Sequence, residues 1–226
     1  MEQTIKYKGY QIKIVRDTDP MNPRTDWDNA GVMCCWHRRY NLADMQNGKP
    51  ISSQYNEPVD LLYELAELNR DDEQELREGN DISIAELLRI IKEEKGTIIL
   101  PLYLYDHSGI TISTSPFSCS WDSGQIGWIY MTKETMEKEK WTKEQAEKYL
   151  EGEVEVYDQY LTGDVWGYQV LDEDENIIES CYGYYGDTGI EDAIQEGKSH
   201  IDYRCKKEQE EYEKQPKKKA AELHTV

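Results

Sequence analysis

Residues 97–113 read TIILPLYLYDHSGITIS. The run from Thr97 to Tyr105 is filled by β-branched, aliphatic and aromatic residues, which favours a strand. Pro101 indicates an edge or a bulge in that strand, because proline donates no hydrogen bond to a sheet ladder. Turn-forming residues follow at 106–109, and residues 110–113 then alternate between apolar and polar. The stretch therefore predicts a β-hairpin near the middle of the chain.

Similar patterns on both sides of this hairpin predict the other strands. Runs of alternating or β-branched residues, bounded by Gly, Asn and Asp, lie at 4–15, 32–36, 126–131, 165–171 and 177–184. The first run is divided by Lys8-Gly9, and the last two flank the acidic turn 172–176, so each forms a hairpin.

Helices are expected where apolar residues recur every three or four positions, at 56–69, 83–96, 142–163 and 188–216. Capping-box pairs precede three of them: Ser83 with Glu86, Thr142 with Gln145, and Thr188 with Glu191. Hairpins interspersed with about four helices predict an α+β fold with a mostly antiparallel sheet.

The domain organisation follows from length and composition. The chain has 226 residues, and no Pro-, Gly- or Ser-rich linker divides it. We therefore expect a single α+β domain over residues 1–213. Pro216 ends the last expected helix, and residues 214–226 are expected to form a frayed C-terminal tail.

The overall charge excludes several classes of partner. There are 26 Lys and Arg against 46 Asp and Glu, which gives a formal net charge of −20. A protein that binds nucleic acid directly needs cations to displace the counterions of phosphates, and anionic membranes attract cations for the same reason. No apolar run is long enough to span a bilayer, and the first residues lack the apolar core of a signal peptide. We expect a cytoplasmic protein that binds neither nucleic acid nor membrane.

The negative charge is concentrated in residues 141–196, where sixteen acids stand against Lys143 and Lys148, so the segment carries 2 − 16 = −14. Steps of three and four residues place five of these acids on one stripe of the helix expected at 142–163. They are Glu144, Glu147, Glu151, Glu155 and Asp158. Carboxylates spaced by a helical turn of about 5.4 Å approach the spacing of phosphates along a nucleic-acid strand.

We interpret this stripe as a partner-binding surface, assisted by the acidic turn Asp172, Glu173, Asp174 and Glu175. The partner expected is a protein with a basic surface, of the kind that binds nucleic acid. The competing interpretation is that the stripe is only a solvated helix face. Composition alone leaves both open, together with the oligomeric state.

An alternative site lies around the central hairpin. Asp106, His107, Cys119 and Asp122 fall in turns that a hairpin could bring together, and a Cys–His–Asp group is the arrangement of a hydrolase or thiol enzyme. Neither the local signatures of cysteine proteases nor a G-x-S-x-G elbow occurs. Catalysis by these residues is therefore the alternative hypothesis, and we expect a protein that is not an enzyme.

The cysteines of the chain indicate no metal or other cofactor. The five cysteines are odd in number and irregularly spaced, which favours free thiols. Alternation along a strand places Cys35 and His37 on one face and Cys34 on the other, as expected for buried cysteines beside a structural histidine. There is no C-x-x-C pair and no calcium-loop spacing, so we expect no metal.

Three segments resemble a family of proteins encoded by phages and mobile elements of gut bacteria: WDNAGVMCCWHRRYNLAD from Trp27, LYLYDHSGITISTSPFSCSWDSGQIGWIY from Leu102, and YDQYLTGDVWGYQVLDEDENIIESCYGYYG from Tyr157. The family supplies no site residues. The resemblance implies a bacterial host and a setting in which small acidic proteins inhibit restriction or CRISPR systems, some by imitating DNA. The combined expectation is an anti-defence inhibitor that acts by nucleic-acid charge mimicry. A third possibility is a structural or regulatory phage protein whose acidity only aids solubility.

Overall fold

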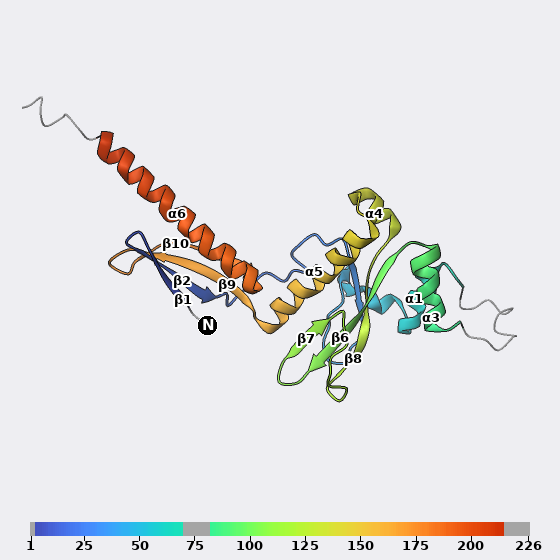
Figure 1. The fold of residues 1–226 in the computed structure, drawn as a ribbon. Coiled ribbons are helices and arrows are strands. Elements are labelled where there is room, and N and C mark those ends of the chain that lie inside the picture. Colours follow the sequence, from blue (N-terminus) through green and yellow to red (C-terminus); the bar gives the residue numbers. More distant parts are fainter. Residues whose placement is uncertain (1–2, 70–81, 215–226) are drawn as a thin grey trace, which may run out of the picture. The chain divides into compact units, whose positions relative to one another are not determined.

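A computed structural model describes residues 3–69 and 82–214, which contain five helices and ten strands in mostly antiparallel sheets (Figure 1). This confirms the expected α+β fold. The chain divides into two compact units. The central unit comprises residues 22–162, and the terminal unit combines residues 1–21 with residues 163–226. No linker-like sequence marks the boundary between the two units, and the terminal unit is assembled from both ends of the chain.

The central unit is built on a four-stranded sheet in the order β3-β8-β6-β7. Its strands are β3 (Val32–Cys35), β6 (Ile98–Asp106), β7 (Ile110–Ser113) and β8 (Ser123–Met131). The expected central hairpin is confirmed as β6 and β7. Pro101 pairs with Trp128 of β8, whereas β7 pairs only with residues from Tyr103 onward. The proline therefore precedes the β6–β7 ladder, next to a register shift between Leu102 and Tyr103.

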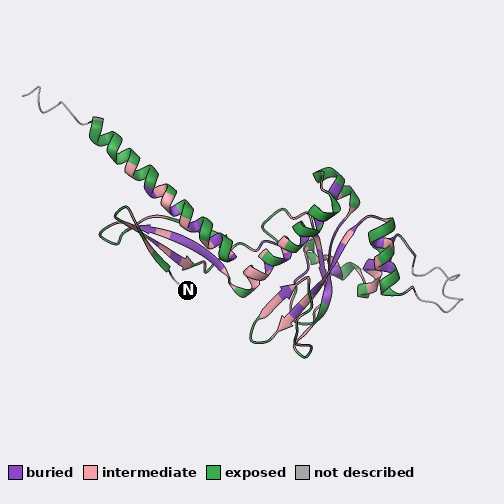
Figure 2. Cartoon of the chain, in the orientation of Figure 1, coloured by how far each residue is buried: buried purple, intermediate pink, exposed green. Residues whose placement is uncertain are grey.

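Helices cover both faces of this sheet. On one face, Leu150 and Val154 of α5 (Lys143–Thr162) join a core with Leu102 and Ile129. On the other, α1 (Pro58–Ala66), α3 (Ile84–Arg89) and the π-helical turn η2 (Ile90–Glu94) pack against a core that includes Trp128. Figure 2 shows the resulting buried strands. Burial on both faces explains why residues 97–105 are apolar almost throughout.

Two parts of the central unit differ from expectation. The segment between β3 and α1, where no helix or strand was expected, contains the two-residue strands β4 (Met45–Gln46) and β5 (Lys49–Pro50) and the 3-10 helix η1 (Ile51–Gln54). The helix α4 (Lys133–Glu139) was not anticipated. Its only buried residue is Met136, so it has no apolar periodicity that the sequence could reveal.

The helix caps are partly as expected. Ser83 caps α3 through the Glu86 amide, and Thr142 and Gln145 form the capping box of α5, with bonds of 2.9 and 3.2 Å. The cap at Thr188 is wrong, because α6 (Gly186–Lys214) begins two residues earlier. A Cβ atom at Gly189 would lie 2.7 Å from the Tyr184 carbonyl carbon, so Gly189 permits close packing against the preceding strand.

The terminal unit has a sheet in the order β1-β2-β9-β10, covered by α6 (Figure 1). Both expected hairpins are confirmed, as β1 (Gln3–Tyr7) with β2 (Tyr10–Arg16) and β9 (Val165–Leu171) with β10 (Ile177–Tyr185). The core includes Ile12, Ile14, Trp166, Tyr168 and Ile201. The tail expected at 214–226 lies, apart from Lys214, outside the described residues.

Within residues 3–69 and 82–214, no helix combines the length and the apolar character that crossing a membrane requires.

Candidate functional site

The acidic face of α5 is formed by Glu144, Glu147, Glu151 and Glu155, which are all exposed. The buried face of the helix consists of Ala146, Leu150, Val154 and Tyr157 and packs on the sheet. Packing of the apolar face therefore holds the four carboxylates on the solvent side of a twenty-residue helix.

None of these four carboxylates forms an ion pair with a basic side chain of the described chain. Other exposed acids of the protein do pair: Glu86 with Arg89 at 2.8 Å, Glu208 with Arg204 at 3.1 Å, and Asp202 with Lys8 at 2.7 Å. Like charges one turn apart also repel each other by a few tenths of a kcal/mol. The acidic face is thus a concentration of negative charge that forms no ion pair with the described residues.

The structure gives Asp158, the fifth residue of the expected stripe, a different role. Its Oδ1 accepts a hydrogen bond from the backbone N–H of Ile112 in β7 at 2.8 Å, and the residue is half-buried. Asp158 lies at the border between the exposed and apolar faces of α5, where a short acid can reach the sheet. We therefore assign it to the attachment of α5 to β7.

The acidic turn at 172–176 joins β9 and β10 in the terminal unit. The Asp172 carboxylate accepts the backbone N–H of Asp174 at 3.0 Å and of Asn176 at 2.8 Å. These bonds, led by the one from Asn176, lower the pKa of Asp172. Asp172 thus shapes the turn, whereas Glu173, Asp174 and Glu175 are exposed.

A buried ion network attaches the loop before β3 to α5. Arg24 lies 2.6 Å from Asp44 and 2.6 Å from Glu153, and its side chain is only 2% exposed. Glu153 also accepts the backbone N–H groups of Ala30 at 2.9 Å and Gly31 at 3.1 Å. Burial opposes the guanidinium charge, but hydrogen bonds and the negative charges of both acids outweigh it and raise the pKa of Arg24.

This network could not be found from the sequence. Glu153 counts there as one more acid of the segment 141–196, and Arg24 stands in a loop 129 residues away. Because every partner is held within the central unit, the network fixes the loop against α5.

An apolar groove of about 350 Å³ lies between this loop and α5. Trp27 and Tyr149 line it, and these two aromatic residues are 41% and 38% exposed. Pro23, Gly152 and Val156 complete the apolar lining, and Lys148 stands at its edge. The groove therefore opens on α5 beside the acidic face.

The alternative thiol site is partly brought together. Asp122 Oδ2 lies 3.2 Å from His107 Nδ1 and 3.9 Å from Cys119 Sγ. The Asp106 backbone N–H donates to the Asp122 carbonyl at 2.8 Å, so the turn containing Asp106 and His107 adjoins the turn before β8. The fold thus brings His107, Cys119 and Asp122 together, which the sequence left open.

Their arrangement does not match a nucleophilic relay. In such a relay the histidine contacts the nucleophile and the acid orients the histidine. Here the carboxylate of Asp122 contacts both other groups, and the Asp106 carboxylate pairs with Arg39. His107 is 63% exposed, so the cluster also lacks the water-excluding surroundings of an active site.

Cys34 and Cys35 are buried in opposite cores of the central unit, as strand alternation predicts. Burial raises the pKa of Cys34 to about 12 and also raises the pKa of Cys35. All five cysteines are free thiols, which confirms the sequence interpretation. Neither of the two buried thiols is suited to act as a nucleophile.

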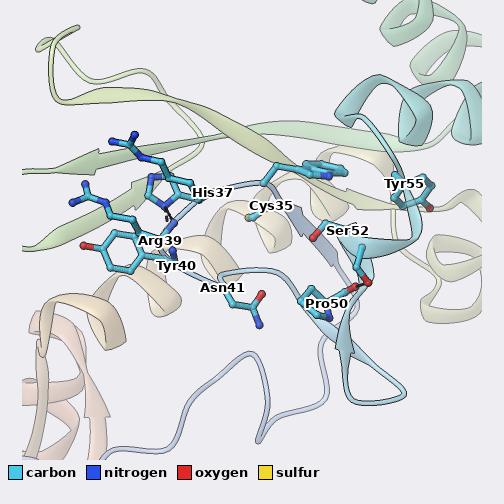
Figure 3. Close-up of a pocket in the computed structure, with 11 residues that line it drawn as sticks. Cys35, His37, Arg39, Tyr40, Asn41, Pro50, Ser52 and Tyr55 are labelled. Carbon is cyan, nitrogen blue, oxygen red and sulfur yellow. Dashed lines mark hydrogen bonds between the residues drawn. The ribbon is translucent and has the colours of Figure 1, made fainter.

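A hollow of about 690 Å³ lies beside Cys35 (Figure 3). His37 and Tyr40 line one side, and Pro50, Ser52 and Tyr55 line the other. His37 Nδ1 accepts the backbone N–H of Arg39 at 3.4 Å and of Tyr40 at 3.3 Å, and its ring stacks on Tyr40 with 5.1 Å between centroids. These contacts give His37 the structural role expected from the sequence.

Over residues 3–69 and 82–214, no three His, Cys, Asp or Glu side chains are grouped so that they could hold a metal ion. Comparison of the chain with protein-family models, with curated proteins and with solved structures finds no match.

Proposed function

We propose that the protein binds an electropositive surface of another protein through the acidic face of α5. In the bacterial setting that the sequence resemblance implies, the partner is a host protein whose basic surface binds nucleic acid. The protein then acts as an anti-defence inhibitor, of restriction or CRISPR systems, by occupying that surface in place of nucleic acid.

The observation that carries this proposal is the concentration of carboxylates on one face of α5, at Glu144, Glu147, Glu151 and Glu155. Each is exposed, and none forms an ion pair within residues 3–69 and 82–214, although other exposed acids of the chain do. The same basic groups that neutralise phosphates can neutralise these carboxylates.

The charges and the nearby aromatic groups have different roles in this function. Complementary charge accelerates encounter and excludes wrong partners, whereas desolvated aromatic contacts supply most of the affinity. The acidic face therefore governs association rate and salt dependence. Binding should weaken as added salt shortens the screening length to about 3 Å at 1 M.

The test compares two full-length variants that change the net charge equally. The first carries Glu144→Lys, Glu147→Lys, Glu151→Lys and Glu155→Lys. The second carries the same kind of change at Glu191, Asp192, Glu210 and Glu211, which are exposed on α6. Each immobilised protein is incubated with lysate of a bacterial host at low salt, and retained proteins are identified and challenged with duplex DNA.

We expect the wild type and the α6 variant to retain a nucleic-acid-binding protein that duplex DNA displaces. The α5 variant should lose it. Equal retention by all three proteins would show that the acidic face recognises nothing and only aids solubility.

A further inference from the structure

We propose that the groove formed by Trp27, Tyr149 and Gly152 binds a bulky apolar side chain from a Lys/Arg-rich segment of the partner, whose cations contact the acidic face of α5. This inference rests on the proposed function and specifies the chemistry of the partner segment. Three observations carry it: a glycine without an internal packing role, a pair of exposed aromatic rings, and the position of the acidic face.

Gly152 lies in the interior of α5, where glycine is among the poorest helix formers. A Cβ atom at this position would meet no atom within 4 Å. By contrast, a Cβ at Gly31 would lie 2.3 Å from the Leu150 side chain. The fold of the protein thus explains Gly31 but not Gly152, and the space beside Gly152 is available to a partner.

The walls of the groove are suited to an apolar group. Trp27 and Tyr149 offer exposed rings, and aromatic residues of this kind dominate the energetics of protein interfaces. Tyr149 is also supported by Trp141, with 4.4 Å between ring centroids. The loop that carries Trp27 is held by the buried Arg24 and Glu153, so both walls are ordered before a partner binds.

The surroundings of the groove select a cationic segment. Gly152 and Glu155 are three residues apart on α5, so they are neighbours on the helix surface. Glu151 and Glu144 lie within a turn of Lys148, at the groove edge. A segment whose apolar residue enters the groove therefore brings residues within about one helical turn onto the acidic face. Lys148 is the one groove residue that repels such a segment.

The test uses a fluorescent Lys/Arg-rich peptide with one central Trp and the same peptide with Ser in place of Trp. Binding to the full-length protein is measured by fluorescence anisotropy. Burial of a large apolar side chain predicts that the Trp peptide binds about tenfold more tightly than the Ser peptide. Lys148→Glu removes the repelling charge and should strengthen binding of both peptides.

Two substitutions at Gly152 separate the groove from the charge. Gly152→Leu fills the groove and should remove the preference for Trp while leaving the affinity for the Ser peptide unchanged. Gly152→Ala should reduce the preference partly and raise the melting temperature. Glu151→Lys with Glu155→Lys should weaken binding of both peptides to the same extent.

A preference for the Trp peptide that survives Gly152→Leu would overturn this inference and leave the proposed function intact. If Glu151→Lys with Glu155→Lys left the affinity for both peptides unchanged, that result would contradict the proposed function instead. A chain shortened to end at residue 214 tests a different occupant. If it bound the Trp peptide more tightly than the full-length protein does, the groove's occupant would be the C-terminal segment, and the inference would be overturned. Self-association that Gly152→Leu abolishes would identify a second copy and would also overturn it.

Discussion

The Glu153 carboxylate lies 2.6 Å from the Arg24 guanidinium, and the two side chains are 7% and 2% exposed. Glu153→Ala should destabilise the central unit by about 3–5 kcal/mol, because it leaves a buried charge without one of its partners. It also removes the acceptor for the Ala30 and Gly31 amides. Denaturant unfolding monitored by tryptophan fluorescence measures the change.

Glu151→Ala is the matched control for this prediction. Glu151 stands on the same helix two residues away but is exposed, so its removal should change the stability by no more than about 0.5 kcal/mol. Equal effects of the two substitutions would show that the Arg24 network does not hold the loop to α5.

The second prediction concerns Asp158. Asp158→Ala should destabilise the central unit by about 1–3 kcal/mol, because the buried Ile112 amide loses its acceptor. Asp158→Asn keeps an oxygen acceptor and should restore most of the loss, and Glu155→Ala should be nearly neutral. Thermal unfolding of the three variants checks this order. A destabilised Asn variant would point to a role for the charge itself.

Glu153 and Asp158 are residues whose structural roles could not be predicted from the sequence. The central hairpin, both terminal hairpins and the cap of α5 depend on neighbouring residues, so local patterns predicted them. Glu153 and Asp158 depend on contacts 129 and 46 residues away, and no local pattern separates them from the exposed acids beside them. The α4 helix was missed for a related reason, since only Met136 packs inward.

The acidic face itself was largely predictable. Helical periodicity placed Glu144, Glu147, Glu151 and Glu155 on one side of the helix, and the structure exposes all four. The adjacent groove was not predictable, because Trp27 approaches Tyr149 only through the fold of the central unit.

The third prediction concerns thiol reactivity. Cys34 and Cys35 should not react with Ellman's reagent at pH 8 in the native protein, because burial keeps their thiols protonated, with the pKa of Cys34 at about 12. Cys119, Cys181 and Cys205 are half-buried and should react. Denaturation should expose the remaining two thiols. The native wild-type and Cys34→Ser proteins should therefore show the same number of fast-reacting thiols. A smaller number in the Cys34→Ser protein would show that Cys34 is accessible.

The fourth prediction concerns pH. Hydrogen bonds from the turn lower the pKa of Asp172, so its contribution to stability is present above the pKa of an unfolded aspartate and is lost as the pH falls through the lowered folded value. The Asp172 carboxyl resonance should titrate below the usual value of an unfolded aspartate. The amide of Asn176 should lose exchange protection over the same pH interval. An Asp172 titration at or above the usual value would contradict the turn geometry.

The most direct test of the central claim is capture by the α5 charge-reversal variant beside the α6 variant of equal charge. We expect Glu144→Lys with Glu147→Lys, Glu151→Lys and Glu155→Lys to abolish low-salt retention of a nucleic-acid-binding host protein, whereas the same change in charge on α6 leaves retention intact. Equal retention by both variants, or equal loss, would contradict a binding role for the acidic face.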